Sequence, residues 1–171
     1  MNIPETYNYL VRARRDLWPA LQSLPDEFVS RTLLPGDRFH SIKDIVHHIA
    51  AVEDGWIRED ILRQEPLRAS NLTLKDLPDG PIYGCVPLET LLNFARDVEK
   101  STLAYLAVLN DAELRRTMTP HDAPDEHYTV DGILWHVLIH EIRHTAQITT
   151  LLRQQDIKPP YLDLLNYLPR T

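Results

Sequence analysis

Three histidines follow one another at four-residue steps near the end of the chain: His136, His140 and His144. In a helix, side chains four residues apart lie on the same face. On a helical wheel with Ile133 at zero, His140 and His144 fall at about 340° and 20°, in the middle of the apolar stripe, and His136 falls at its edge. Two imidazoles one turn apart can each direct a nitrogen at a single ion, as they do in zincins. The spacing therefore predicts two metal ligands on one helix.

The competing explanation is structural, because a single histidine on a core face is usually bonded to a carbonyl group. A third imidazole favours metal, and an earlier segment supplies the pair His47 and His48. On the wheel that starts at Ile42, His48 lies near the buried face and His47 is predicted to face solvent. Three imidazoles with open coordination positions are typical of catalytic metal sites.

Several carboxylates also fall toward the predicted apolar faces, namely Glu53, Asp60 and Glu99. Each could orient a ligand imidazole, accept a proton near the ion, or pair with a basic side chain at an exposed end of the bundle. The last explanation is favoured for any one of them alone. Glu53 and Gln147, which lies at the edge of the histidine stripe, are nevertheless candidates for roles beside the ion.

A di-iron site is a second metal hypothesis, because Glu141 and His144 form a Glu-x-x-His motif. Di-iron bundles use this motif twice, together with two further glutamates. The chain has one copy, and its counterpart, Asp44 with His47, is predicted to point away from the apolar face. The sequence therefore disfavours a di-iron centre.

These side chains require long helices to position them. The chain has only five glycines, and its thirteen prolines fall mainly between segments whose apolar residues recur every three or four positions. Ser41 and Thr129 are suited to cap two of the helices, and Pro19 should kink or shorten the first one. The pattern predicts an all-α, four-helix bundle that forms a single domain over residues 1–171. The expected segments are Tyr7 to Leu21, 41–64, 88–109 and 130–154, with long connections at 65–87 and 110–129 and a tail at 159–171.

Composition excludes several classes of function. The 18 basic and 25 acidic residues give a formal net charge of −7, which argues against nucleic acid and anionic membranes as partners. The first ten residues lack the basic start and apolar run of a secretory signal, and no apolar segment is long enough to span a membrane. Cys85 is the single cysteine, so a reducing cytoplasm is the expected setting.

The last long helix has a second apolar stripe opposite its histidines. A helix that is apolar on two sides is buried on both. Either the bundle itself covers this stripe, or a two-fold contact between two copies of the chain does so. The residues are Trp135, Leu138, Ile139, Ile142 and Ala146.

The segments His48 to Glu53, His136 to Ile148 and Leu151 to Asp163 resemble the DinB/YfiT-like superfamily. The resemblance implies a four-helix bundle of up-down-down-up connection, often a homodimer, with a divalent metal on three histidines. Those positions correspond to His48, His140 and His144. Many members read His-Arg-Gly-Gln where this chain has His144-Thr-Ala-Gln147, which leaves the substrate open.

The resemblance implies a metal-dependent enzyme that acts on a small molecule, such as a thiol-dependent S-transferase. The ion would be zinc or nickel, with iron and copper as alternatives, and a low-molecular-weight thiol would be the second cofactor. The alternative is a non-catalytic, stress-related metal-binding bundle that acts through its stability or through a partner.

Overall fold

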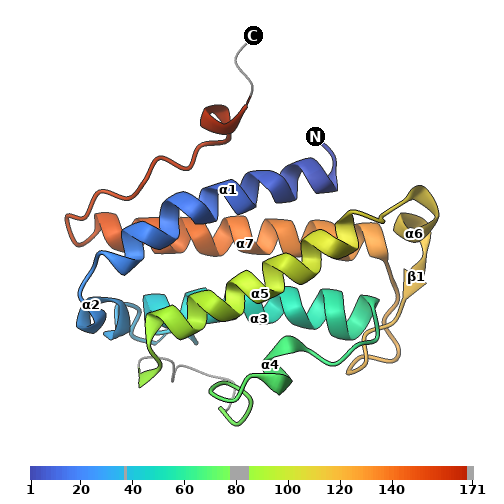
Figure 1. Ribbon diagram of the computed structural model, residues 1–171, viewed down its shortest axis with the longest axis horizontal. Coiled ribbons are helices and arrows are strands. Elements are labelled where there is room, and N and C mark those ends of the chain that lie inside the picture. Colours follow the sequence, from blue (N-terminus) through green and yellow to red (C-terminus); the bar gives the residue numbers. More distant parts are fainter. Residues whose placement is uncertain (37, 78–84, 169–171) are drawn as a thin grey trace.

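Four long helices cross the molecule in the computed structural model, which describes residues 1–36, 38–77 and 85–168. Figure 1 shows that the first and last run in one direction and the two middle ones in the opposite direction. This is the up-down-down-up topology, and the expected four-helix bundle is confirmed. The helices are α1 (Ile3–Gln22), α3 (Ile42–Asp54), α5 (Leu88–Leu106) and α7 (Val130–Arg153).

The two capping residues predicted from the sequence begin their helices. The Ser41 hydroxyl accepts from the backbone N–H of Asp44 at 3.1 Å, and the Asp44 carboxylate accepts from the backbone N–H of Ser41 at 2.9 Å. Thr129 Oγ1 accepts from the N–H of Gly132 at 3.1 Å. These bonds satisfy donors that the first turn of a helix leaves without partners. Pro19 does not end α1, which continues to Gln22.

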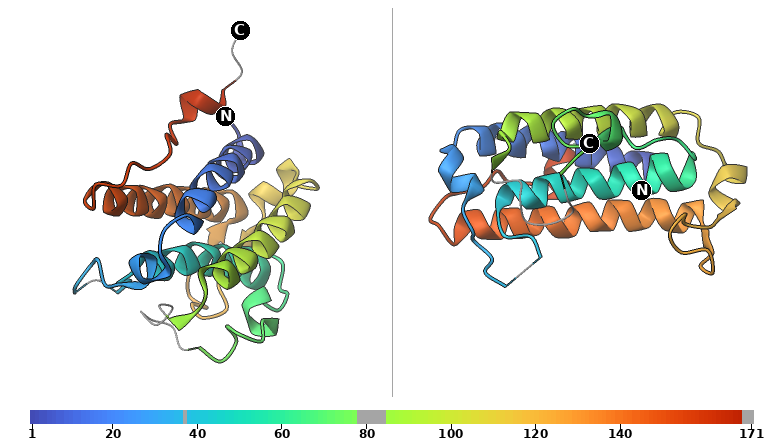
Figure 2. Two further views of the ribbon diagram at one scale, coloured as in Figure 1. Left: turned by 60° about the vertical axis from the view of Figure 1, so that its left-hand side comes forward. Right: turned by 90° about the horizontal axis from the view of Figure 1, so that it is seen from below.

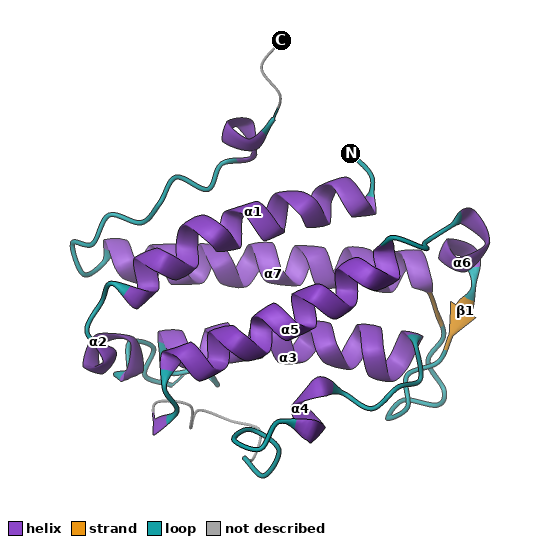
Figure 3. Ribbon diagram, in the orientation of Figure 1, coloured by secondary structure: helices purple, strands orange, loops and turns teal. Residues whose placement is uncertain are grey.

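The connections contain short elements that the periodicity did not predict. A π-helix, η1, continues α3 and ends at Ile61 rather than at the expected residue 64. Two short strands pair antiparallel just before α7, and Figure 3 shows β1 beside the start of that helix. Within the expected connection 65–87, residues 78–84 lie outside the described part. The short elements are α2 (Asp26–Ser30), η1 (Gly55–Ile61), α4 (Leu67–Ser70), α6 (Asp111–Arg115), β1 (Thr117–Met118), β2 (Tyr128–Thr129) and η3 (Leu164–Tyr167).

The packing places α3 between α5 and α7, as the right-hand view of Figure 2 shows, while α1 contacts α5 and α7. The buried apolar side chains form two clusters, one toward each end of the bundle. Leu21, Leu92 and Ile148 belong to one cluster, and Tyr7 and Ile133 belong to the other. Of the helices described, none is long and apolar enough to cross a membrane.

Candidate metal centre

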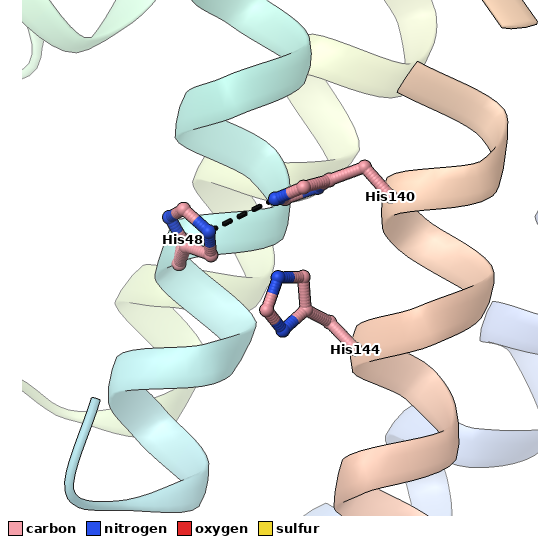
Figure 4. A group of neighbouring side chains, drawn as sticks. All are labelled: His48, His140 and His144. Carbon is pink, nitrogen blue, oxygen red and sulfur yellow. Dashed lines mark hydrogen bonds between the residues drawn. The ribbon is translucent and has the colours of Figure 1, made fainter. Parts of the chain in front are cut away.

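The three predicted histidines come together on facing sides of α3 and α7. One nitrogen from each of His48, His140 and His144 lies within 4.8 Å of the others. The Nε2 atoms of His48 and His140 are 2.9 Å apart. Figure 4 shows the three rings converging in the space between the two helices. All three side chains are half-buried, so the cluster borders solvent on one side.

The environment of the cluster keeps two of its imidazoles, those of His48 and His140, neutral. Burial, and after it the neighbouring His144, lowers the pKa of His48 to about 4. Burial followed by His144 and His48 lowers the pKa of His140 to about 3. A neutral imidazole has one nitrogen with a lone pair, which is the form that binds a metal ion. At neutral pH the two rings are therefore in the ligating state.

The donor set fits one divalent ion. Zinc binds imidazole nitrogen at about 2.0–2.1 Å, so two ligands of a tetrahedral site lie about 3.4 Å apart. The observed separations, from 2.9 Å up to the limit of 4.8 Å, bracket that value. Small rotations of the side chains would bring the three nitrogens to the separation that a tetrahedral site requires. Three imidazoles suit zinc, nickel, iron or copper.

Gln147 and Phe39 hold two of the rings in place. The Gln147 side-chain carbonyl, Oε1, lies 2.5 Å from Nδ1 of His144. Because a carbonyl oxygen can only accept, Nδ1 of His144 carries the proton and Nε2 keeps the lone pair. Phe39 stacks on the His48 ring with centroids 3.9 Å apart. Sequence reasoning missed Phe39, because a loop residue leaves no periodic signal.

His136 lies outside the cluster although it continues the four-residue spacing. It is exposed, and its ring centroid is 5.9 Å from that of His140. Its other ring neighbour is Trp56 of η1, at 5.6 Å. The position at the edge of the stripe was therefore predicted correctly.

The expectation that His47 faces solvent is wrong. Only 3% of His47 is exposed, and its ring stacks on Phe94 of α5. The same side of α3 buries Lys43, whose ammonium group bonds Asp26 of α2 at 2.7 Å. Two helices therefore cover a face that the wheel of α3 alone assigned to water. The short helix α2 could not be inferred from periodicity.

Glu53 belongs to a buried ion cluster rather than to the histidine face. Arg14 donates to Glu53 Oε2 at 2.6 Å and to both oxygens of Glu141 at 2.6 and 2.7 Å. It also donates to Glu99 and to the Tyr7 hydroxyl, both at 3.2 Å, while Tyr7 donates to Glu53. The charged groups lie between the two apolar clusters, at mid-height of the bundle, and Tyr7 belongs to one of those clusters.

The cluster has two consequences for the predictions. Glu141 bonds Arg14, so the Glu-x-x-His motif does not direct a carboxylate at the histidines. Glu53 and Glu99 pair with a basic side chain, as favoured for each alone, but the pairing is buried inside the bundle and not at an exposed end. Arg14 itself was missed, although it falls in register with Leu10 and Leu17 on the apolar stripe of α1. A charged residue on that stripe was the available signal.

A groove of about 500 Å³ opens beside His48. Its walls come from α3, η1, α4, the segment after α4 and the loops before α3 and before α7, and they carry charges of both signs. The basic side chains are Arg38, Arg68 and Lys75, and the acidic ones are Asp54, Glu59, Asp60 and Asp122. Asp60, the third predicted inward carboxylate, accepts from the backbone N–H of His121 at 2.8 Å.

The second apolar stripe of α7 is only partly covered by the bundle. Leu138 is buried, whereas Ile139 and Ile142 are 51% and 43% exposed. Packing within one chain therefore does not account for the whole stripe.

Comparison with known proteins agrees with this architecture. The sequence model of the DinB family matches residues 1–171. A search of curated proteins gave no match. Among solved structures, YfiT from Bacillus subtilis superposes with a TM-score of 0.68 at 19% identity, over 91% of this chain and 89% of YfiT. YfiT is described as a probable metal-dependent hydrolase with an unusual four-helix bundle topology.

Proposed function

The chain belongs to the DinB family, and we propose that it is a metal-dependent enzyme in which His48, His140 and His144 hold one divalent ion. The observation that supports this most directly is the convergence of three imidazoles, two of which have strongly lowered pKa values. A divalent ion held there would act as a Lewis acid and bring the pKa of a bound water or thiol toward neutrality.

Neighbouring side chains support the ligands. Gln147 fixes the tautomer and orientation of His144 through Nδ1. Phe39 covers one face of the His48 ring and excludes water from it. Both contacts reduce the freedom of the ligating rings before an ion binds, which favours metal affinity. Gln147 is therefore proposed as a positioning residue, and Glu53, which bonds Arg14, is not proposed to act at the ion.

For the reaction we propose transfer of a low-molecular-weight thiol to a small electrophile. Such thiols carry carboxylate and amino groups, and the groove beside His48 offers charges of both signs to receive them. Arg38 and Lys75 would bind the carboxylates, and Glu59 would bind the amine. Hydrolysis is the second candidate, because YfiT, which shares the fold, is described as a metal-dependent hydrolase.

The first test is the metal content of protein purified without a histidine tag. We expect one divalent ion per chain in the parent and loss of it in His48→Ala and His144→Ala. His136→Ala is the matched control, since it removes an exposed imidazole one turn away on the same helix and should retain the ion. Gln147→Leu should weaken metal affinity by about 10-fold. A parent that takes up neither zinc nor nickel would overturn the proposal.

The second test separates the reactions. Metal-loaded protein is first assayed for loss of free thiol in the presence of an alkylating electrophile, with glutathione and bacillithiol compared as the thiol. It is then assayed for hydrolysis of activated esters and amides. Turnover that requires a thiol supports transfer, and turnover with water alone supports hydrolysis. A protein that gains stability from the ion but turns over neither substrate is the non-catalytic bundle.

A homodimer formed through Ile139 is also proposed, and sedimentation of the purified protein tests it.

A further inference from the structure

A separate cavity of about 190 Å³ lies inside the bundle, lined by α1, α3, α5 and α7. It shares no lining residue with the groove beside His48. Along α3, the cavity is lined by Val46, Ile49, Ala50 and Glu53, whereas His48 lines the groove. The two spaces therefore lie on different sides of the same helix.

Most of the cavity wall is aliphatic. Leu10 and Leu17 contribute from α1, Val46 and Ile49 from α3, and Ile148 from α7. An apolar cavity of about 150 Å³ stays dry and admits benzene in other proteins, because neither water nor the wall gains hydrogen bonds there. The cavity in this chain is somewhat larger, so a small aromatic molecule fits its volume.

One end of the cavity is polar, and the guanidinium there has no N–H group left for a ligand. The five N–H groups of Arg14 are all used: Nε bonds Glu141, Nη1 bonds Tyr7 and Glu99, and Nη2 bonds Glu53 and Glu141. Carboxylate oxygens each have capacity for more than one donor. Glu53 and Glu141 line this end, and with Glu99 they oppose three carboxylates to one guanidinium, so it would repel an anion and accept a donor from a neutral ligand.

The cavity reaches the surface between α1 and α7. Ile142 is 43% exposed and Ala146 is also exposed, and both line the opening. The chain after α7 turns back beside α1 (Figure 1), where Leu162 lines the cavity and its carbonyl accepts from the Tyr9 hydroxyl at 2.7 Å. In a single copy of the chain, a ligand can therefore enter past Ala146 and be covered by the C-terminal segment.

We propose that this cavity is a second binding site, for a small neutral aromatic molecule that carries one hydrogen-bond donor. The ring occupies the aliphatic walls, and the donor reaches the carboxylates of Glu53 or Glu141. Anionic aromatics are excluded by the charge at that end. The site does not depend on the ion, because no histidine lines it.

Binding is measured by titrating the metal-free and metal-loaded protein with indole while recording the methyl NMR signals of its isoleucines. Saturable shifts are expected at Ile49 and Ile148, which line the cavity, and not at Ile3, which lies at the start of α1. Benzyl alcohol and benzoate then form a pair of similar size. Benzoate should bind at least about 10-fold more weakly, a difference of about 1.4 kcal/mol.

Two substitutions to leucine fill the space. Ala13→Leu places a larger side chain in the cavity wall. Ala146→Leu narrows the opening, where the side chain is exposed and a larger one should not destabilise the fold. Each should weaken indole binding by about 10-fold or more. Ala20→Leu, on α1 but outside the cavity, is the matched control and should leave the affinity unchanged. Any one of three results would overturn the proposal: no saturable shift at Ile49, equal affinities for benzoate and benzyl alcohol, or an unchanged affinity for indole in Ala146→Leu.

Discussion

Replacement of Arg14 by methionine should destabilise the protein more than any surface substitution. Arg14 is 6% exposed, and its partners Glu53 and Glu141 are 2% and 4% exposed. Methionine fills a similar volume but leaves these carboxylates buried without a counter-charge. Removing one partner of a buried ion pair costs about 3–5 kcal/mol. For a chain of this length, that loss corresponds to a fall in Tm of about 6–20 °C.

The loss should depend on pH in a defined direction. Burial, its largest cause, raises the pKa of Glu141 above 4.5, and the Arg14 guanidinium opposes that rise. Without Arg14 the pKa rises further, so the folded variant binds more protons than its unfolded chain. Stability then falls as pH increases through the raised pKa, and the deficit relative to the parent shrinks as pH decreases toward 4.5.

Urea denaturation followed by circular dichroism at several pH values measures both effects. Arg15→Met is the matched control, because the neighbouring side chain of Arg15 is 70% exposed and its removal should change stability by less than about 0.5 kcal/mol. Adding Glu53→Gln and Glu141→Gln to Arg14→Met should restore part of the loss, since the two most buried carboxylates are then neutral and Glu99 keeps Arg15 at 4.0 Å. A deficit below about 1 kcal/mol, or one that grows as pH falls, would refute this reasoning.

Two further substitutions test contacts at the ends of α3 and α7. Asp26→Asn should lower stability at neutral pH by up to about 1 kcal/mol, because the Asp26 carboxylate is exposed although its partner Lys43 is buried. The hydrogen bond from Lys43 lowers the pKa of Asp26, so this contribution is present above pH 3.8 and is lost as pH falls through the lowered pKa, where acid titrations of the two proteins should converge. Thr129→Ala removes the hydrogen bond that Thr129 Oγ1 accepts from the Gly132 N–H, and it should lower stability by about 1 kcal/mol. Thr129→Ser keeps a hydroxyl there and should retain most of that stability, as thermal melts would show.

The parts of the fold that depend on local spacing could be predicted from the sequence. Apolar periodicity predicted the four long helices, and the caps Ser41 and Thr129 predicted two of their first residues. The i, i+4 step placed His140 and His144 on one face whatever lies opposite them. Their proximity to His48 followed from apolar faces that must meet in one core.

What could not be predicted depends on contacts between distant segments. The position of His47 is decided by α2 and α5, which lie far from it in sequence. A helical wheel drawn for one helix gives a single direction for its buried face. That direction is misleading when two neighbouring helices bury two different sides, as α2 and α5 do for α3. Phe39 reaches His48 from a loop, and the sequence has no pattern that specifies that contact.

The buried ion cluster explains how the rotation of the site-bearing helices is fixed. One guanidinium, that of Arg14, bonds Glu53 of α3 and Glu141 of α7, so each helix has a single rotation about its axis that satisfies the pairing. Apolar side chains alone would tolerate small rotations, because packing of similar shapes differs little in energy. His140 precedes Glu141 directly, and any rotation of α7 would move its ring away from His48. The charges that the bundle buries at mid-height therefore set the geometry of the histidines on the neighbouring side of the same helices.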